Sequence, residues 1–94
     1  MKSKYYNIFC KIFGKVQGVG YRAWTKKSAE KHYLTGWVKN CDDKTVECEV
    51  SGLEENLQLF LKDCSIGPLL SSVKKVQSKK KPFTRFSSFI IYFK

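Results

Sequence analysis

The hydrophobic pattern of this chain switches repeatedly between two periodicities, and that switching constrains the fold more than any other feature. Segments with a period of two residues predict strands, whereas a period of about 3.6 residues predicts helices. We predict strands at 5–13, 34–40, 45–50, 73–79 and 89–93, and helices at 22–32 and over the stripe Leu53, Leu57, Phe60, Leu61 and Cys64. The predicted order is therefore strand, helix, strand, strand, helix, strand, followed by a final strand.

This order predicts an α+β fold of the ferredoxin-like type, a split β-α-β sandwich with two helices on one face of an antiparallel sheet. The 94 residues have the length of one domain, which we expect to cover residues 1–94. Ser51 and Glu54 fit a capping box at the start of the second helix. The lysines of 73–79 indicate an edge strand, because exposed charges discourage pairing between sheet edges.

The composition favours a globular cytoplasmic protein. Hydrophobic residues make up 43% of the chain, and no apolar run approaches the roughly 18 residues of a membrane span. Lys11 and Gly14 interrupt the first apolar stretch, so we interpret it as a strand and not as a signal peptide. The four cysteines are widely spaced and His32 is the only histidine, so we expect reduced thiols and no metal site.

The formal net charge of +10 would attract anions of many kinds, including nucleic acid, anionic lipid or a small phosphorylated molecule. A lysine-rich surface that is simply well solvated has the same composition. Charge therefore does not select a function.

The most informative segment is the glycine-rich loop 14–20 together with Arg22. Its three glycines allow successive backbone N–H groups to point into one concavity, which leads into the start of a helix, where free N–H groups favour an anion. Arg22 adds a planar fork that can grip phosphate oxygens in pairs. The spacing matches neither a P-loop nor a dinucleotide-binding fingerprint. A phosphate site and an ordinary glycine turn beside a surface arginine both fit this short pattern.

Two motifs in this order resemble the acylphosphatase family. Gly14-Lys15-Val16-Gln17-Gly18-Val19-Gly20-Tyr21-Arg22 is similar to that family's first signature, GxVQGVxFR, and Gly36-Trp37-Val38-Lys39-Asn40 to its second, GWVxN. The resemblance continues through Thr45-Val46-Glu47, Gly67-Pro68 and the aromatic C-terminal strand, so it covers nearly the whole chain.

The resemblance implies an acylphosphatase that hydrolyses the carboxyl-phosphate bond of acyl phosphates. Arg22 and Asn40 would be catalytic, with Asn40 positioning the attacking water. The phosphate would be bound by Gln17, Gly18, Val19, Gly20, Tyr21 and Arg22. We expect no cofactor and no metal, inorganic phosphate as both product and inhibitor, no membrane association, and a monomer.

The chemistry of acyl phosphates is consistent with a site that lacks acidic residues and histidine. The leaving carboxylate has a conjugate acid with a pKa of about 4, so it needs no general acid. A loose phosphoryl-transfer transition state needs little help from a base, and positioning with charge stabilisation is sufficient.

The chain also departs from the family pattern. Tyr33 stands where the family usually has a glycine at the end of the first helix. Lys44 stands where the family commonly has a glycine in the turn after Asn40, at 41–44. At Tyr33 we expect either a left-handed backbone at a cost of about 1 kcal/mol or a different helix end. We expect Trp37 to anchor the core near the site, with a stacking role as the less favoured alternative, and His32 to be structural.

Two other functions remain as alternatives. One is a non-catalytic or accessory domain of the same family. The other is a nucleic-acid-binding module on this fold, which would need stacking aromatics on the third strand. That strand instead carries Glu47 and Glu49 where bases would stack, so we do not expect nucleic acid as a partner.

Overall fold

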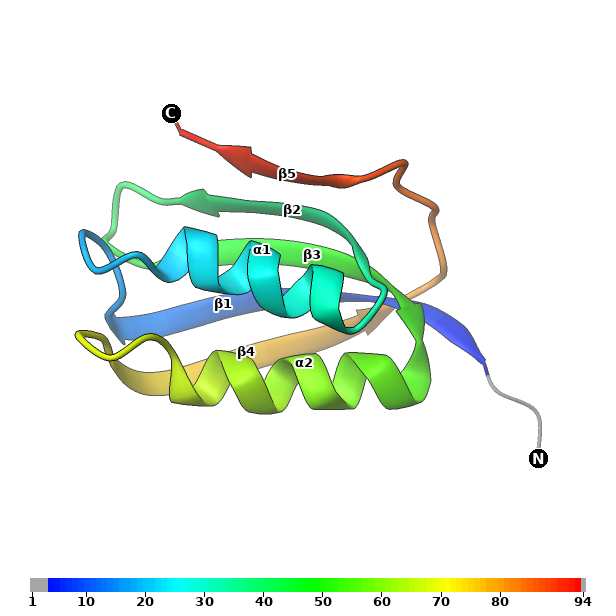
Figure 1. Ribbon diagram of the computed structural model, residues 1–94, viewed down its shortest axis with the longest axis horizontal. Coiled ribbons are helices and arrows are strands. Elements are labelled where there is room, and N and C mark those ends of the chain that lie inside the picture. The colour runs from blue at the N-terminus through cyan, green and yellow to red at the C-terminus, as the bar shows by residue number, and fades with distance from the viewer. Residues whose placement is uncertain (1–3, 94) are drawn as a thin grey trace.

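The computed structural model describes residues 4–93 and shows two helices packed on one face of a five-stranded sheet (Figure 1). The elements in chain order are β1 (Tyr5–Lys15), α1 (Tyr21–Lys31), β2 (Thr35–Asn40), β3 (Val46–Leu53), α2 (Glu54–Ile66), β4 (Ser72–Lys81) and β5 (Phe89–Tyr92). This is the predicted ferredoxin-like α+β architecture. No helix formed by residues 4–93 is long and apolar enough to cross a bilayer.

The strands lie in the order β4-β1-β3-β2-β5, so the lysine-rich β4 is an edge strand, as predicted. The pairs β1–β4, β1–β3 and β2–β3 are antiparallel, whereas β5 pairs with β2 in parallel. Residues 82–88 make this parallel pairing possible, because they carry the chain from the end of β4 to the start of β2, where the Gly36 N–H donates to the carbonyl of Ser88 (3.0 Å).

The core lies between the sheet and the helices. Alternate residues of β1 and β3 face the core and pack against α2. The core residues of these three elements are Ile8, Cys10, Ile12, Val46, Cys48, Val50, Leu57, Phe60 and Cys64. Cys10 and Cys48 lie opposite each other in register and are fully buried. Hydrogen bonding with the Cys10 and Cys64 thiols, together with burial, holds the pKa of Cys48 well above its ordinary value, so this thiol is unreactive.

The capping box predicted for the second helix is wrong. Helix α2 begins at Glu54, Leu53 is its N-cap, and no side chain caps it. The reason is that β3 continues through Leu53, which places Ser51 inside the sheet, where its hydroxyl lies 3.0 Å from that of Thr35. The Glu54 N–H donates instead to the carbonyl of Lys4 (2.9 Å).

The expectation that Trp37 anchors the core is also wrong. Val38 faces the helices and is fully buried, so its neighbour Trp37 points to the opposite face of the sheet, which no helix of residues 4–93 covers (Figure 1). We call this side the open face. There the Trp37 ring packs against those of Phe9 and Tyr92.

Both residues that replace a glycine have left-handed backbone, and at Tyr33 this is one of the two outcomes that we expected. Tyr33 has φ 60° and Lys44 has φ 75°, both in the left-handed region that disfavours side chains with a Cβ. Tyr33 follows the end of α1, where the Leu34 N–H donates to the carbonyl of Ala29 (2.8 Å), the long hydrogen bond of a Schellman motif.

Candidate active site

The glycine loop brings the chain from β1 into α1. Gly14 and Lys15 belong to the end of β1, not to the loop as predicted, so the loop itself covers 16–20. Gly18 (φ 74°) and Gly20 (φ 82°) both adopt left-handed backbone, and Gly20 is the N-cap of α1. Apart from the glycine itself and its two chain neighbours, no atom of the described residues lies within 4 Å of where a Cβ would stand on either residue. The backbone conformation, and not crowding, therefore requires glycine here.

The first turn of α1 has backbone N–H groups available to an anion. The Trp24 N–H makes the first intrahelical bond, to the carbonyl of Gly20 (3.0 Å). The preceding N–H groups at 21–23 therefore have no acceptor within the helix. The first turn contains no acidic residue that would neutralise this positive end of the helix.

A cavity of about 240 Å³ opens at this helix end. It is lined by the loop, the first turn of α1, the end of β2 and the C-terminal strand: Val16, Gly18, Gly20, Tyr21, Arg22, Ala23, Asn40, Ile91 and Phe93. Figure 1 shows why these segments meet, because the loop before α1, the end of β2 and the end of β5 all lie at the left end of the sheet. The cavity is smaller than typical pockets for drug-sized ligands and suits a small anionic substrate.

Arg22 is held by the C-terminal strand. Its Nη1 donates to the carbonyl of Tyr92 (2.8 Å), and its guanidinium carbon lies 4.8 Å from the centroid of the Phe93 ring. No carboxylate within residues 4–93 forms an ion pair with Arg22. A guanidinium has five N–H donors, so most of its capacity remains for an anion in the cavity.

Asn40 ends β2 on the helix side of the sheet and lines the same cavity as Arg22. Its Oδ1 is buried and has no hydrogen-bond partner among the described residues. A buried acceptor without a partner costs about 1–3 kcal/mol, and such atoms are rare in folded proteins. In this cavity, which Arg22 and the first turn of α1 also line, the oxygen can accept a hydrogen bond from a bound ligand or water.

Not all predicted phosphate-binding residues line the cavity. Gly18, Gly20, Tyr21 and Arg22 do, whereas Val19 packs against the core. The Tyr21 side chain is also buried, where its hydroxyl donates to the carbonyl of Cys64 (2.8 Å) and burial raises its pKa. Tyr21 can therefore offer an anion only its backbone.

Gln17 points away from the cavity. Its Nε2 donates to the carbonyls of Cys41 and Thr45, each at 2.9 Å, at the two ends of the turn between β2 and β3. The side chain thus ties the glycine loop to the turn that directly follows Asn40. Neither this link nor the contribution of β5 to the cavity follows from the motifs.

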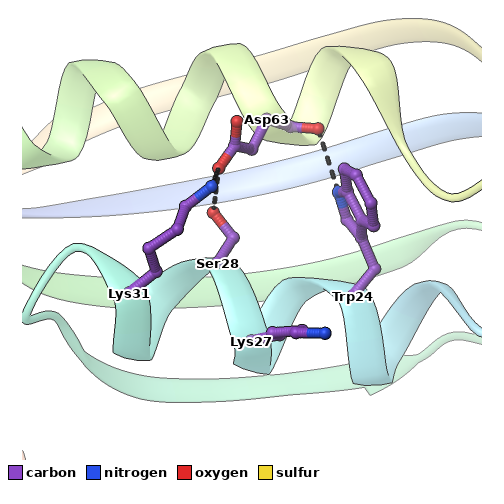
Figure 2. A pocket seen from close by; sticks show the side chains of 5 residues that line it. All are labelled: Trp24, Lys27, Ser28, Lys31 and Asp63. Atoms are coloured by element: carbon purple, nitrogen blue, oxygen red, sulfur yellow. Dashed lines mark hydrogen bonds and ion pairs between the residues drawn. The ribbon is translucent and has the colours of Figure 1, made fainter.

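A second cavity, of about 200 Å³, lies along the other half of α1 and is lined by Trp24, Lys27, Ser28, Lys31 and Asp63 (Figure 2). Asp63 binds three of the other four lining residues, Trp24, Ser28 and Lys31. Asp63 Oδ2 accepts from Ser28 Oγ (2.7 Å) and lies 3.3 Å from Lys31 Nζ, and the Asp63 carbonyl accepts from Trp24 Nε1 (3.0 Å). These contacts join α1 to α2, so we interpret this cavity as structural.

His32 belongs to the same junction. Its Nε2 lies 3.1 Å from Asp63 Oδ2, which fits the structural role expected for it. Burial alone would raise the pKa of Asp63, but hydrogen bonds with Ser28 and His32 and the ion pair with Lys31 outweigh it and lower that pKa.

Comparison with known proteins identifies the family. The Acylphosphatase family matches residues 8–91. The chain is 50% identical to the acylphosphatase of Bacillus licheniformis over 70% of its own length and 73% of that protein, and 42% identical to that of Pseudothermotoga lettingae over 89% and 94%. An acylphosphatase structure from Coxiella burnetii superposes with a TM-score of 0.90 at 31% identity, covering 94% of this chain and 93% of that one. The chain belongs to the acylphosphatase family.

Proposed function

We propose that this chain hydrolyses acyl phosphates in the cavity between Arg22 and Asn40, releasing a carboxylate and inorganic phosphate. The N–H groups at the start of α1 and the Arg22 guanidinium would hold the phosphoryl oxygens. Asn40 Oδ1 would accept a hydrogen bond from the attacking water. The observation that carries the proposal is that this buried oxygen and Arg22 line the same cavity, and that within residues 4–93 the oxygen has no hydrogen-bond partner and Arg22 has no carboxylate partner.

The residues around the cavity can supply positioning and charge but no proton transfer. Among residues 4–93, no aspartate, glutamate or histidine lines the cavity. An acyl phosphate suits such a site because its leaving carboxylate departs without protonation, whereas an alkyl phosphate would need a general acid. Val16, Ile91 and Phe93 form apolar walls, which strengthen the attraction between Arg22 and the charge of the transition state.

The mechanism as proposed uses no metal ion, and the cavity is formed by one chain. Among residues 4–93, no three histidine, cysteine, aspartate or glutamate side chains are grouped so that they could hold a metal. We infer that the protein acts as a monomer. The four free cysteines suit a reducing compartment, and we infer a cytoplasmic location from them.

The test is turnover of benzoyl phosphate, measured with a chelator and with increasing inorganic phosphate. We expect turnover that the chelator leaves unchanged and that phosphate inhibits by competition, since the product occupies the same cradle. Phosphate binding without turnover would instead support the accessory, non-catalytic alternative. Activity lost to the chelator would contradict the metal-independent mechanism.

A further inference from the structure

The open face of the sheet carries a row of aromatic side chains. The ring centroids of Phe9 and Trp37 lie 6.2 Å apart, as do those of Trp37 and Tyr92, with interplanar angles of 59° in both pairs. Phe9 comes from β1, Trp37 from β2 and Tyr92 from β5, so the row crosses the sheet. Tyr92 is 47% exposed, and the other two rings are half-buried. We call these three residues the aromatic row.

Lysines surround the aromatic row on the same face. Strand register places Lys79 beside Phe9, and Lys75 beside Phe13, whose ring lies 5.3 Å from Lys75 Nζ. Lys75 and Lys79 are exposed, and neither forms an ion pair with a carboxylate of the described residues. By alternation, Lys11, Lys39 and Lys81 point to this face as well.

The two glutamates on this face, which led us not to expect nucleic acid as a partner, are both bound by neighbouring side chains. Glu49 lies in register between Phe9 and Trp37, where it is 9% exposed and bound by Asn7 (2.8 Å) and Lys81 (3.1 Å). The aromatic rings therefore cover its carboxylate.

Glu47 is also enclosed by cations. It stands between Lys11 and Lys39, whose ammonium groups lie 3.7 and 3.9 Å from its oxygens, and its side chain is 21% exposed. Lys11 also pairs with Asp43 (3.0 Å), so the five lysines meet three carboxylates, Asp43, Glu47 and Glu49. Lys75 and Lys79 on β4 form no ion pair with a carboxylate of the described residues. The surface offered to a partner is thus aromatic and cationic.

We propose that the open face binds single-stranded nucleic acid, with bases stacked on the aromatic row and phosphates held by Lys75 and Lys79. Aromatic side chains accept bases of any sequence because every base has a π-face, and a flanking basic strip follows the phosphate backbone. This reverses our expectation from the sequence, which rested on Glu47 and Glu49. The proposal is independent of the acyl phosphate site, which opens on the helix side of the sheet.

The first experiment tests the lysines. It measures the anisotropy of a labelled oligouridylate of about 12 nucleotides, a length in the range that small domains bind. We expect the double variant Lys75→Glu and Lys79→Glu to weaken binding at least tenfold. The matched control reverses two exposed lysines on the helices, Lys27→Glu and Lys62→Glu, and should weaken it less than threefold. Equal losses in the two variants would overturn the proposal, because they would mean that only net charge matters.

The second experiment tests the aromatic row. Trp24→Phe leaves Trp37 as the only tryptophan, whose fluorescence stacked bases should quench, and Phe9→Leu should weaken binding several-fold while circular dichroism remains unchanged. Binding without quenching, or equal affinity for heparin, a polyanion without bases, would overturn the proposal. Equal affinity for a duplex would do so too, since paired bases cannot stack on the row. Asn40→Ala, which changes no charge and no residue of the aromatic row, should bind the oligonucleotide like the wild type, which separates this face from the phosphate cradle.

Discussion

The two halves of helix α1 border two cavities of similar volume, and the cavities differ in whether their polar groups have partners. At the N-terminal half, Arg22 has no carboxylate and Asn40 Oδ1 has no hydrogen-bond partner within the described chain. At the C-terminal half, Asp63 receives Ser28, Lys31 and His32 at one carboxylate oxygen (Figure 2). Satisfied groups stabilise a fold, whereas unsatisfied groups held in place are available to a substrate.

The largest expected effect comes from Arg22→Ala, which should lower kcat/KM for benzoyl phosphate by at least roughly 10³-fold, as for other arginines that stabilise phosphoryl transfer. It should also abolish inhibition by phosphate. Lys27→Ala, which changes a cation at the other cavity, serves as the control and should leave both unchanged. If Arg22→Ala turned over normally, the N-terminal cavity would not be the active site.

Asn40→Ala should lower kcat by roughly 10²-fold with little change in KM, because the amide would act mainly in the transition state. The free energy of unfolding of this variant should not fall, since the oxygen that is removed has no hydrogen-bond partner among the described residues.

Asn7 provides the contrast, because both ends of its buried amide are bound: its Nδ2 donates to Glu49 (2.8 Å), and its Oδ1 accepts from the Thr84 N–H (2.8 Å). Asn7→Ala should lose stability and keep kcat. Urea titrations measure stability and steady-state kinetics measure kcat for both variants. A loss of stability in Asn40→Ala together with a loss of kcat in Asn7→Ala would contradict the assignment of Asn40 to catalysis.

Gln17→Met should lower kcat by roughly tenfold without changing KM. The substitution keeps the length of the side chain but removes both hydrogen bonds to the turn after Asn40, so the phosphate cradle stays while the water-positioning group shifts. A rise in KM with constant kcat would instead make Gln17 part of phosphate binding, as the family resemblance implied. Whether kcat or KM changes therefore distinguishes a role of Gln17 in positioning Asn40 from a role in phosphate binding.

These residues also show how far sequence reasoning reaches. The order of strands and helices follows from local periodicity. The two residues that we propose as catalytic, Arg22 and Asn40, each lie in a motif of contiguous residues. The role of Gln17, the parallel pairing of β5 and the position of Phe93 depend on contacts between segments far apart in the chain, which no local pattern encodes. Trp37 was misplaced for a related reason, because large aromatics usually pack in cores, while strand alternation here turns its ring to the open face.

Asp63→Asn should destabilise the fold by about 1 kcal/mol at neutral pH while kcat stays constant, since it weakens the junction of α1 and α2 and not the N-terminal cavity. The pKa of Asp63 is lowered in the folded state. Its contribution to stability is therefore complete above the unfolded pKa of about 3.9 and is lost as the pH falls through the lower folded value. Urea titrations across this acidic range should show a smaller pH dependence for the variant. An unchanged pH dependence would show that the junction does not stabilise through this carboxylate.

The smallest expected effect lies just beyond the C-terminal end of α1. Tyr33 is 86% exposed and has φ 60°, so Tyr33→Gly removes backbone strain and little packing. We expect it to stabilise the protein by up to about 1 kcal/mol, equivalent to a rise in Tm of roughly 4 °C for a domain of this size, with kcat unchanged. Tyr33→Ala is the matched control, because it removes the ring but keeps the Cβ and thus the strain. If alanine stabilised as much as glycine, the gain would come from losing an exposed ring and not from the backbone. A change in kcat with glycine would show that the two halves of α1 are coupled, which their separate sets of contacts argue against.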